Sequence, residues 1–172
     1  MVTSNDRAFC ILVACDNDIG MKKMPYFMYL MQVAGFEVNY RYTIRTDRIR
    51  SHGLSKDVNL LTSMGVLDNS YGVTDKGGAE LSKYYITAYD DSLCDMIVDY
   101  VRDLDIHDLY VLCVVDIIVM ETLSNSGYEG LIKNKPKMLE DIRYLCGEVP
   151  DDVFDFCIGV MRKIRNRRNE RA

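Results

Sequence analysis

The sequence has no tryptophan, and it has only two histidines and three prolines among its 172 residues. Its six cysteines include no Cys-x-x-Cys pair. Structural zinc sites are usually built from such pairs together with histidines. Because His52 and His107 are the only histidines, we expect no metal site.

The N-terminal segment does not resemble a secretory leader. Residues 1–6 are polar, and the apolar run from Ala8 to Ala14 is short and has no basic segment before it. Most of the cysteines lie inside apolar helical patterns, where a reduced thiol acts as a small hydrophobic group. These features predict a cytoplasmic protein with free thiols rather than a disulfide framework.

The sequence also lacks an apolar run long enough to cross a membrane. Its most apolar segment, LYVLCVVDIIVM at residues 109–120, is too short and is interrupted by Asp116. This segment predicts a central core helix or an oligomer face, so a homodimer stays open. If Asp116 is buried, it must find a donor, because an unpaired buried charge is costly. We expect it to reach solvent or to pair with a Tyr or an Arg rather than to act in catalysis.

No pattern typical of an enzyme is present. Gly77-Gly78 is not followed by the Lys and Ser/Thr of a phosphate-binding loop. Ser51 and His52 are adjacent, so they do not face each other on a helix, and no nucleophile-elbow pattern surrounds them. We therefore predict no catalytic residue, no cofactor and a non-enzymatic function.

What the chain does have is an uneven distribution of charge. The net charge is −5, but residues 41–56 carry +4 and residues 162–171 carry +5, which leaves −14 for the rest. An acidic body repels nucleic acid, so any contact with DNA would have to use one of these two basic segments.

Apolar spacing predicts a mainly α protein that forms one compact unit over residues 1–172. Helices are expected over residues 7–15, 22–34, 54–64, from about 75, and over 89–104, 105–123, 136–145 and 151 to the end. Pro25 is expected in the first turn of its helix, and Pro136 at the start of its helix. Residues 36–44 alternate and read as a short strand or an extended connector.

The segment LLTSMGVLDNSYGVTDKGGAEL, residues 60–81, predicts a helix end, a small hairpin and a new helix. Gly65 ends the first helix, residues 66–67 and 71–73 form two short strands, and Thr74 caps the second helix. This order is typical of a winged helix-turn-helix with a small two-stranded wing. We expect a winged-helix-like part over 20–86 and an appended helical half over 87–172. A hairpin that only pins two helices together fits the pattern as well.

The run from Phe27 to Leu81 resembles the bacterial YwgA-like proteins and, more distantly, the SocA-like (Panacea) antitoxin domain. The matching residues are Tyr29, Leu30, Gln32, Gly35, Tyr40, Arg41, Tyr42, Leu61, Gly65, Val66, Leu67, Tyr71, Thr74 and Gly77. The match covers about a third of the chain, and it departs from the family at Arg50-Ser51-His52-Gly53. The resemblance implies a small helical regulator or antitoxin-like module without catalysis.

Two kinds of interface are predicted. The candidate nucleic-acid-binding residues are Arg45, Arg48, Arg50, His52, Lys56 and Asn59, with the arginines placed to contact phosphates. The candidate protein-binding residues are Tyr40, Arg41, Tyr42, Arg165, Arg167 and Arg168, because Tyr and Arg are favoured at interface hot spots. Solvated pairs between these arginines and the acidic body are the simpler interpretation.

Two functions follow from these predictions. The first is a non-enzymatic, antitoxin-like regulatory module, or an inhibitor from a phage or mobile element, that binds a protein partner. The alternative is a winged-helix DNA-binding transcriptional regulator that uses residues 45–63.

Overall fold

The computed structural model describes residues 5–15, 19–36, 38–82, 92–123 and 129–171. Within these ranges the chain is mainly helical, with eight helices and one two-stranded antiparallel sheet. The helices are α1 (Asn5–Cys15), α2 (Gly20–Val33), α3 (His52–Ser63), α4 (Asp75–Leu81), α5 (Ser92–Asp103), α6 (Ile106–Leu123), α7 (Glu129–Cys146) and α8 (Asp151–Arg171). The strands are β1 (Thr43–Arg45) and β2 (Arg48–Arg50).

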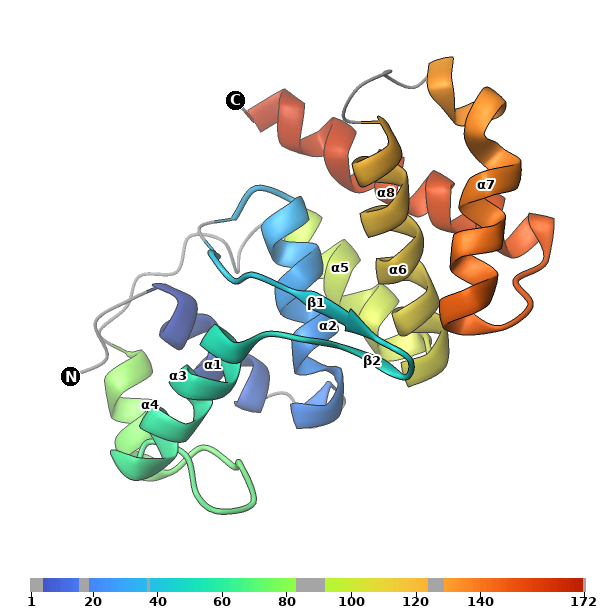
Figure 1. Cartoon of the computed structure of the whole chain (residues 1–172). Coiled ribbons are helices and arrows are strands. Elements are labelled where there is room, and N and C mark those ends of the chain that lie inside the picture. Colours follow the sequence, from blue (N-terminus) through green and yellow to red (C-terminus); the bar gives the residue numbers. More distant parts are fainter. Residues whose placement is uncertain (1–4, 16–18, 37, 83–91, 124–128, 172) are drawn as a thin grey trace.

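Helices α2 and α6 form the centre of the molecule. Both are buried on most sides, as the nearly continuous apolar sequence of α6 predicts. Helix α6 packs against α2, α7 and α8, while α2 packs against α1 and α5. In Figure 1, α1, α3 and α4 gather at one end, α6, α7 and α8 at the other, and α2 and the β1–β2 hairpin lie between them. None of the described helices is both long and apolar enough to cross a membrane.

The helix ends of the N-terminal half agree with the sequence. The Ser51 hydroxyl accepts from the Leu54 N–H at 3.3 Å and caps α3. The Thr74 hydroxyl accepts from the Gly77 N–H at 3.1 Å and caps α4. Gly65 follows α3 with a φ of +68°, a conformation that residues other than glycine rarely adopt. The predicted stop after α3 and the predicted cap of α4 are confirmed.

The sheet lies at a different place from the one predicted. Residues 66–73 contain only an isolated bridge between Leu67 and Val73, and no strand. The turn between them is held by the Asp68 carboxylate, which accepts from the N–H groups of Ser70 and Gly72 at 2.7 and 2.9 Å. The paired strands instead precede α3. Strand β1 overlaps only the end of the segment 36–44 that is predicted as a strand or a connector, and β2 is not predicted.

The predicted helical positions of two prolines are wrong. Helix α2 begins at Gly20, so Pro25 lies inside it and not in its first turn. Helix α7 begins at Glu129, so Pro136 also lies inside a helix that is longer than predicted. The apolar spacing continues through each proline, so it predicts that these residues are helical. It does not show at which residue the helix starts. The predicted start of the helix over residues 89–104 lies outside the described residues, which resume at Ser92.

Candidate nucleic-acid interface

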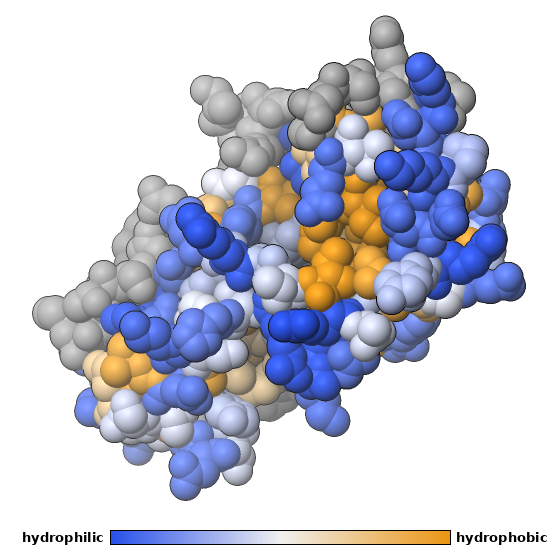
Figure 2. Space-filling model, in the orientation of Figure 1, coloured by the Kyte–Doolittle hydropathy of each residue, from blue (hydrophilic) through white to orange (hydrophobic). Residues whose placement is uncertain are grey.

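The β1–β2 hairpin has one apolar face and one basic face. Its register pairs Ile44 with Ile49, and Arg45 with Arg48. Ile49 is buried and Ile44 is half-buried, whereas all the arginines of the hairpin are exposed. Because successive side chains of a strand point to opposite faces, the two isoleucines turn toward the core and the arginines turn away from it. In Figure 2 the surface over this hairpin is strongly hydrophilic, and an apolar area lies beside it on the side of α6.

The hairpin is fixed to the helical core. Strand β2 packs against α2 and α6. The hydroxyl of Tyr110, on α6, donates to the main-chain carbonyl of Arg45 at 2.5 Å and lies 3.3 Å from the carbonyl of Leu145. Burial raises the pKa of this phenol, so it remains a donor at neutral pH. The arginines therefore project from a backbone whose position is set by the core.

Like charges lie directly opposite each other on the basic face. Arg45 faces Arg48 across the ladder, and Arg50 is the diagonal neighbour of Arg45. Asp47 binds Arg48 through contacts of 2.8 and 3.0 Å, and the hydrogen bond from Arg48 lowers the pKa of this carboxyl. The structure gives no ion pair to Arg45 or Arg50 within the described ranges. Since opposed like charges destabilise a ladder, this arrangement would be relieved by a bound anion.

Helix α3 extends the polar surface. Its cap residue Ser51 directly follows β2, so the helix starts where the hairpin ends. Leu54, Val58 and Leu61 are buried. The residues on the opposite face, His52, Lys56 and Asn59, are all exposed at helical spacings of four and three.

A buried polar cluster holds α3 in place. The Tyr40 hydroxyl donates to Asp57 at 3.0 Å, and the Arg7 guanidinium donates to the other oxygen of Asp57 at 2.8 Å. The Gln32 side chain accepts from the Tyr40 N–H at 2.9 Å. Burial, together with neighbouring Cys10, raises the pKa of Tyr40. The cluster connects α1, α2, the segment before β1 and α3.

A second buried cluster joins α2, α6 and α8. Asp116 is 2% exposed and accepts from Tyr29 at 2.7 Å and from the Arg165 guanidinium at 2.8 and 3.0 Å. The expectation that Asp116 pairs with a Tyr or an Arg is confirmed, since it pairs with both. The Tyr42 ring packs edge-on against Tyr29, at 5.3 Å between ring centroids. Its hydroxyl is buried and has no hydrogen-bond partner among the described residues.

The two sets of predicted interface residues are placed very differently. All six candidate nucleic-acid-binding residues are exposed, and they lie on the hairpin and on the α3 face that follows it. In the protein-binding set only Arg41 is exposed, two residues before β1. Tyr40, Tyr42 and Arg165 belong to the two buried clusters, and the side chains of Arg167 and Arg168 are not described. The first set is exposed throughout, and the described side chains of the second set are mostly not.

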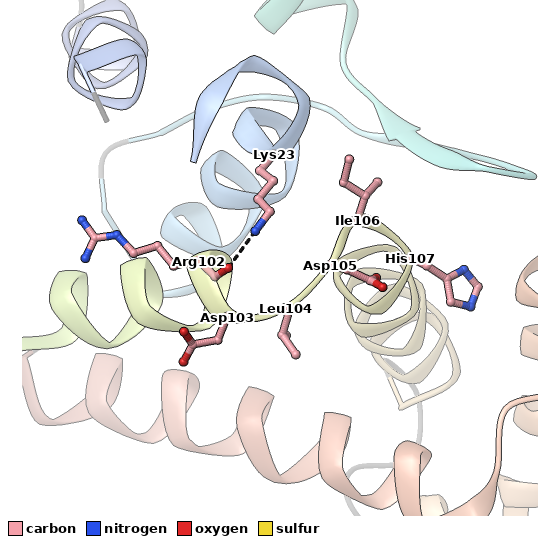
Figure 3. Close-up of a pocket in the computed structure, with 7 residues that line it drawn as sticks. All are labelled: Lys23, Arg102, Asp103, Leu104, Asp105, Ile106 and His107. Carbon is pink, nitrogen blue, oxygen red and sulfur yellow. Dashed lines mark hydrogen bonds between the residues drawn. The ribbon is translucent and has the colours of Figure 1, made fainter. Parts of the chain in front are cut away.

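A shallow hollow of about 540 Å³ surrounds the turn between α5 and α6. Figure 3 shows Lys23 reaching across to the end of α5, where its ammonium donates to the carbonyls of Val101 and Arg102 at 2.7 and 2.8 Å. These bonds occupy carbonyls that the helix end leaves unpaired. Lys23 thus has a structural role in the hollow. Among the described side chains, no group of His, Cys, Asp and Glu is arranged to hold a metal ion.

Comparison with protein-family models, with curated proteins and with solved structures finds no match for this chain. The functional argument therefore depends on the geometry and charge of the surface itself.

Proposed function

We propose that this protein is a non-catalytic nucleic-acid-binding protein, and that the outward face of the β1–β2 hairpin contacts the phosphate backbone. The observation that carries the proposal is the set of three arginines, Arg45, Arg48 and Arg50, on one face of an anchored ribbon in an acidic protein. Arginine forms paired hydrogen bonds with phosphate oxygens and keeps its charge at any physiological pH.

The spacing of the arginines supports a phosphate backbone over a single anion. Side chains two residues apart on a strand are about 6.6 Å apart along it, which is similar to the distance between consecutive phosphates of a nucleic acid strand. Arg48 and Arg50 have this spacing on β2, and Arg45 lies beside them on β1. Several phosphates in a row can therefore be bound at once.

The α3 face provides the second part of the proposed interface. His52, Lys56 and Asn59 can reach base edges or further phosphates next to those bound by the hairpin. Lys56 is the only lysine or arginine in that set, so we expect affinity to depend mainly on phosphates and sequence preference to be weak.

Buried thiols and carboxylates support the non-catalytic part of the proposal. Burial raises the pKa of Cys10 and of Cys157 to about 12, so both thiols stay protonated and poorly nucleophilic at neutral pH. Asp116 is already bound by Tyr29 and Arg165, and these contacts account for its burial.

The test is fluorescence anisotropy with a labelled 24-base-pair duplex of random sequence and with its single strand, between 50 and 200 mM salt. Three phosphate contacts predict a slope of about −3 for log K against log salt on the duplex. The double variant Arg45→Gln/Arg50→Gln should reduce the magnitude of this slope by about 2. The control variant is Lys133→Gln, which removes a charge near the start of α7. This position lies about three turns along α7 from Leu145, whose carbonyl is near Tyr110, so the slope should stay unchanged.

The absence of binding at 50 mM salt would contradict the proposal, as would equal losses for the double variant and for Lys133→Gln. The single-strand arm shows which form is preferred. An antitoxin-like module that binds only a protein partner, the first function expected from the sequence, predicts no salt-dependent binding to either probe.

A further inference from the structure

A small apolar pocket lies where the turn between α5 and α6 meets α8. Its apolar lining consists of Leu104, Val111, Leu112, Val153, Phe156 and Cys157. The volume is about 160 Å³, well below the several hundred Å³ typical of sites for small-molecule ligands. A space of this size takes one large side chain.

The pocket and the arginine hairpin lie on opposite sides of α6. Tyr110 binds the hairpin, whereas Asp108 and Leu112 line the pocket. Residues two apart on an α-helix are separated by about 200° around its axis. A ligand in the pocket therefore does not compete for the surface of the hairpin.

Phe156 leaves the pocket open to a partner. It is 50% exposed and lines the pocket together with Val153, one turn before it on α8, and Cys157, the next residue. A half-exposed phenylalanine next to an apolar space offers contact area that neither α5 nor α6 covers.

One carboxylate lines the pocket, and two more precede lining residues in the chain. Asp108 is part of the lining, and Asp152 directly precedes Val153, one turn before Phe156. Figure 3 shows that Asp103 and Leu104 both point toward α8, away from Lys23. Within the described ranges the structure gives these three aspartates no ion pair.

The acidic residues on the other side of α8 are different. Asp151 and Asp155 lie 3.5 and 3.1 Å from the ammonium of Lys135, on α7. Among the described side chains, Asp151 and Asp155 thus have a cationic partner toward α7, whereas Asp152 forms an ion pair with none of them.

We propose that this pocket binds a cationic amphipathic helix of a protein partner. One large apolar side chain of that helix enters the pocket beside Phe156, and its Lys or Arg residues lie over Asp103, Asp108 and Asp152. An apolar anchor in a groove is the usual way in which a helix docks, and the complementary charges set its orientation. A nucleic acid would be repelled by this rim. A second copy on a two-fold axis would place the same carboxylates against each other.

The experiment uses a fluorescein-labelled 18-residue peptide of leucine and lysine whose leucines fall on one helical face. A peptide of the same composition with the leucines scattered around the helix is its control. The amphipathic peptide should bind the full chain at least tenfold more tightly than the scattered one. Phe156→Ala should weaken the amphipathic peptide about tenfold, and Asp108→Asn/Asp152→Asn should weaken it by a similar factor.

The matched control is Tyr144→Ala, which removes an aromatic side chain that is 85% exposed on α7 and should not change binding. Arg45→Gln/Arg50→Gln should not change it either. Equal affinity for the two peptides, or equal effects of Phe156→Ala and Tyr144→Ala, would overturn the proposal. So would a dimer in sedimentation that Phe156→Ala abolishes, because a second copy would then be the occupant. Asp152→Lys changes only an exposed residue, so it tests the charged rim even if Phe156→Ala lowers the stability of the fold.

Discussion

At the scale of single residues, the arginine face shows a conflict between stability and binding. Arg45 and Arg48 stand directly opposite each other, and among the described residues the one ion pair of this face joins Arg48 to Asp47. Opposed like charges cost a ladder a fraction of a kcal/mol. A surface that keeps such a cost, with one carboxylate for three arginines, is suited to bind an anion.

Replacing Arg45 with Thr should therefore raise the stability of the fold and weaken the binding of nucleic acid. The free energy of unfolding should rise by roughly 0.2–1 kcal/mol, because a cross-strand repulsion is removed and Thr is favoured in strands. Binding to the 24-base-pair duplex at 50 mM salt should weaken. Urea denaturation and anisotropy measure the two quantities on the same sample. A variant that loses stability and binding together would indicate that Arg45 supports the fold instead.

Asp47 should oppose binding. It lies at the tip of the hairpin, and the hydrogen bond from Arg48 keeps the pKa of its carboxyl below its usual value. The substitution Asp47→Asn frees the Arg48 guanidinium and removes a negative charge, so the duplex should bind more tightly and the salt slope should become steeper. Asp141→Asn, at an exposed position of α7, controls for the change in net charge. Equal effects of both substitutions would show that only net charge matters.

The buried pair of Asp116 and Arg165 acts as a structural unit. The substitution Arg165→Met leaves a carboxylate that is 2% exposed with Tyr29 as its remaining partner. Loss of one member of a buried pair costs about 3–5 kcal/mol. The double variant Arg165→Met/Asp116→Asn should recover part of this loss, because the uncompensated charge is gone while Tyr29 keeps an acceptor. Lys163→Met, two residues away and exposed, should change the free energy of unfolding little.

At the scale of elements, the link between α3 and α4 is a compact connector. The Thr74 hydroxyl donates to the carbonyl of Gly65 at 2.7 Å and accepts from the N–H of Gly77. A Cβ at residue 77 would lie 2.4 Å from the carbonyl oxygen of Val66. The connector therefore fixes the angle between the two helices through a few short contacts.

Removal of the Thr74 cap should loosen this connector. The substitution Thr74→Ala should lower the free energy of unfolding by about 1–2 kcal/mol, because it removes a helix cap and leaves the Gly65 carbonyl without its donor. Thr74→Ser keeps the hydroxyl and should cost far less. Urea denaturation followed by circular dichroism separates the two variants, and equal losses would assign the effect to the methyl group of Thr74.

Helices and caps could be predicted because their signals are local. Apolar spacing of 3.6 residues identifies α2 and α3, and Ser51 and Thr74 mark two helix starts within three residues of their bonding partners. Strand β2 could not be predicted, since three residues carry little pattern and the turn Thr46-Asp47 lacks the glycine or asparagine typical of hairpins. The contact between Ile49 and the core that fixes the register comes from a distant part of the chain.

In the candidate site, too, local patterns could be predicted from the sequence, whereas contacts between distant residues could not. The exposure of Arg45, Arg48 and Arg50 follows from their alternation with Ile44 and Ile49 along the strands. The pairing of the half-buried Arg165 could not be inferred, because its partner Asp116 lies 49 residues away in sequence. Its residue type predicts Tyr40 at a protein interface. Its side chain is instead buried and bound to Asp57 on α3, a contact that no local pattern indicates. The apolar pocket beside Phe156 combines residues from α6, α8 and the turn before α6, and it has no sequence signal of its own.

At the scale of the whole molecule, the core contains weakly acidic groups that must stay protonated. Burial raises the pKa of the thiols of Cys10 and Cys157 and of the phenol of Tyr26 to about 12. The ordinary values are 9.0 for the thiols and 10.0 for the phenol. Unfolding exposes all three groups to water, so the unfolded chain releases their protons at a lower pH than the folded chain does.

Stability should therefore decrease in alkaline solution. Below about pH 9 both states bind these protons, and the groups contribute no pH dependence. Between pH 9 and 12 the unfolded state binds fewer protons than the folded state, so the free energy of unfolding falls by up to about 1.4 kcal/mol per pH unit for each group. Urea denaturation at pH 7, 9, 10 and 11 measures this change.

The substitution Cys157→Ala removes one of the three groups and should flatten the decrease above pH 9. The substitution Cys146→Ala should have a smaller effect, because this thiol is partly exposed and burial raises its pKa only to about 11. A free energy of unfolding that stays constant up to pH 11 would mean that these side chains reach water in the folded protein, and that the core between α1, α2, α6 and α8 is less closed than the structure shows.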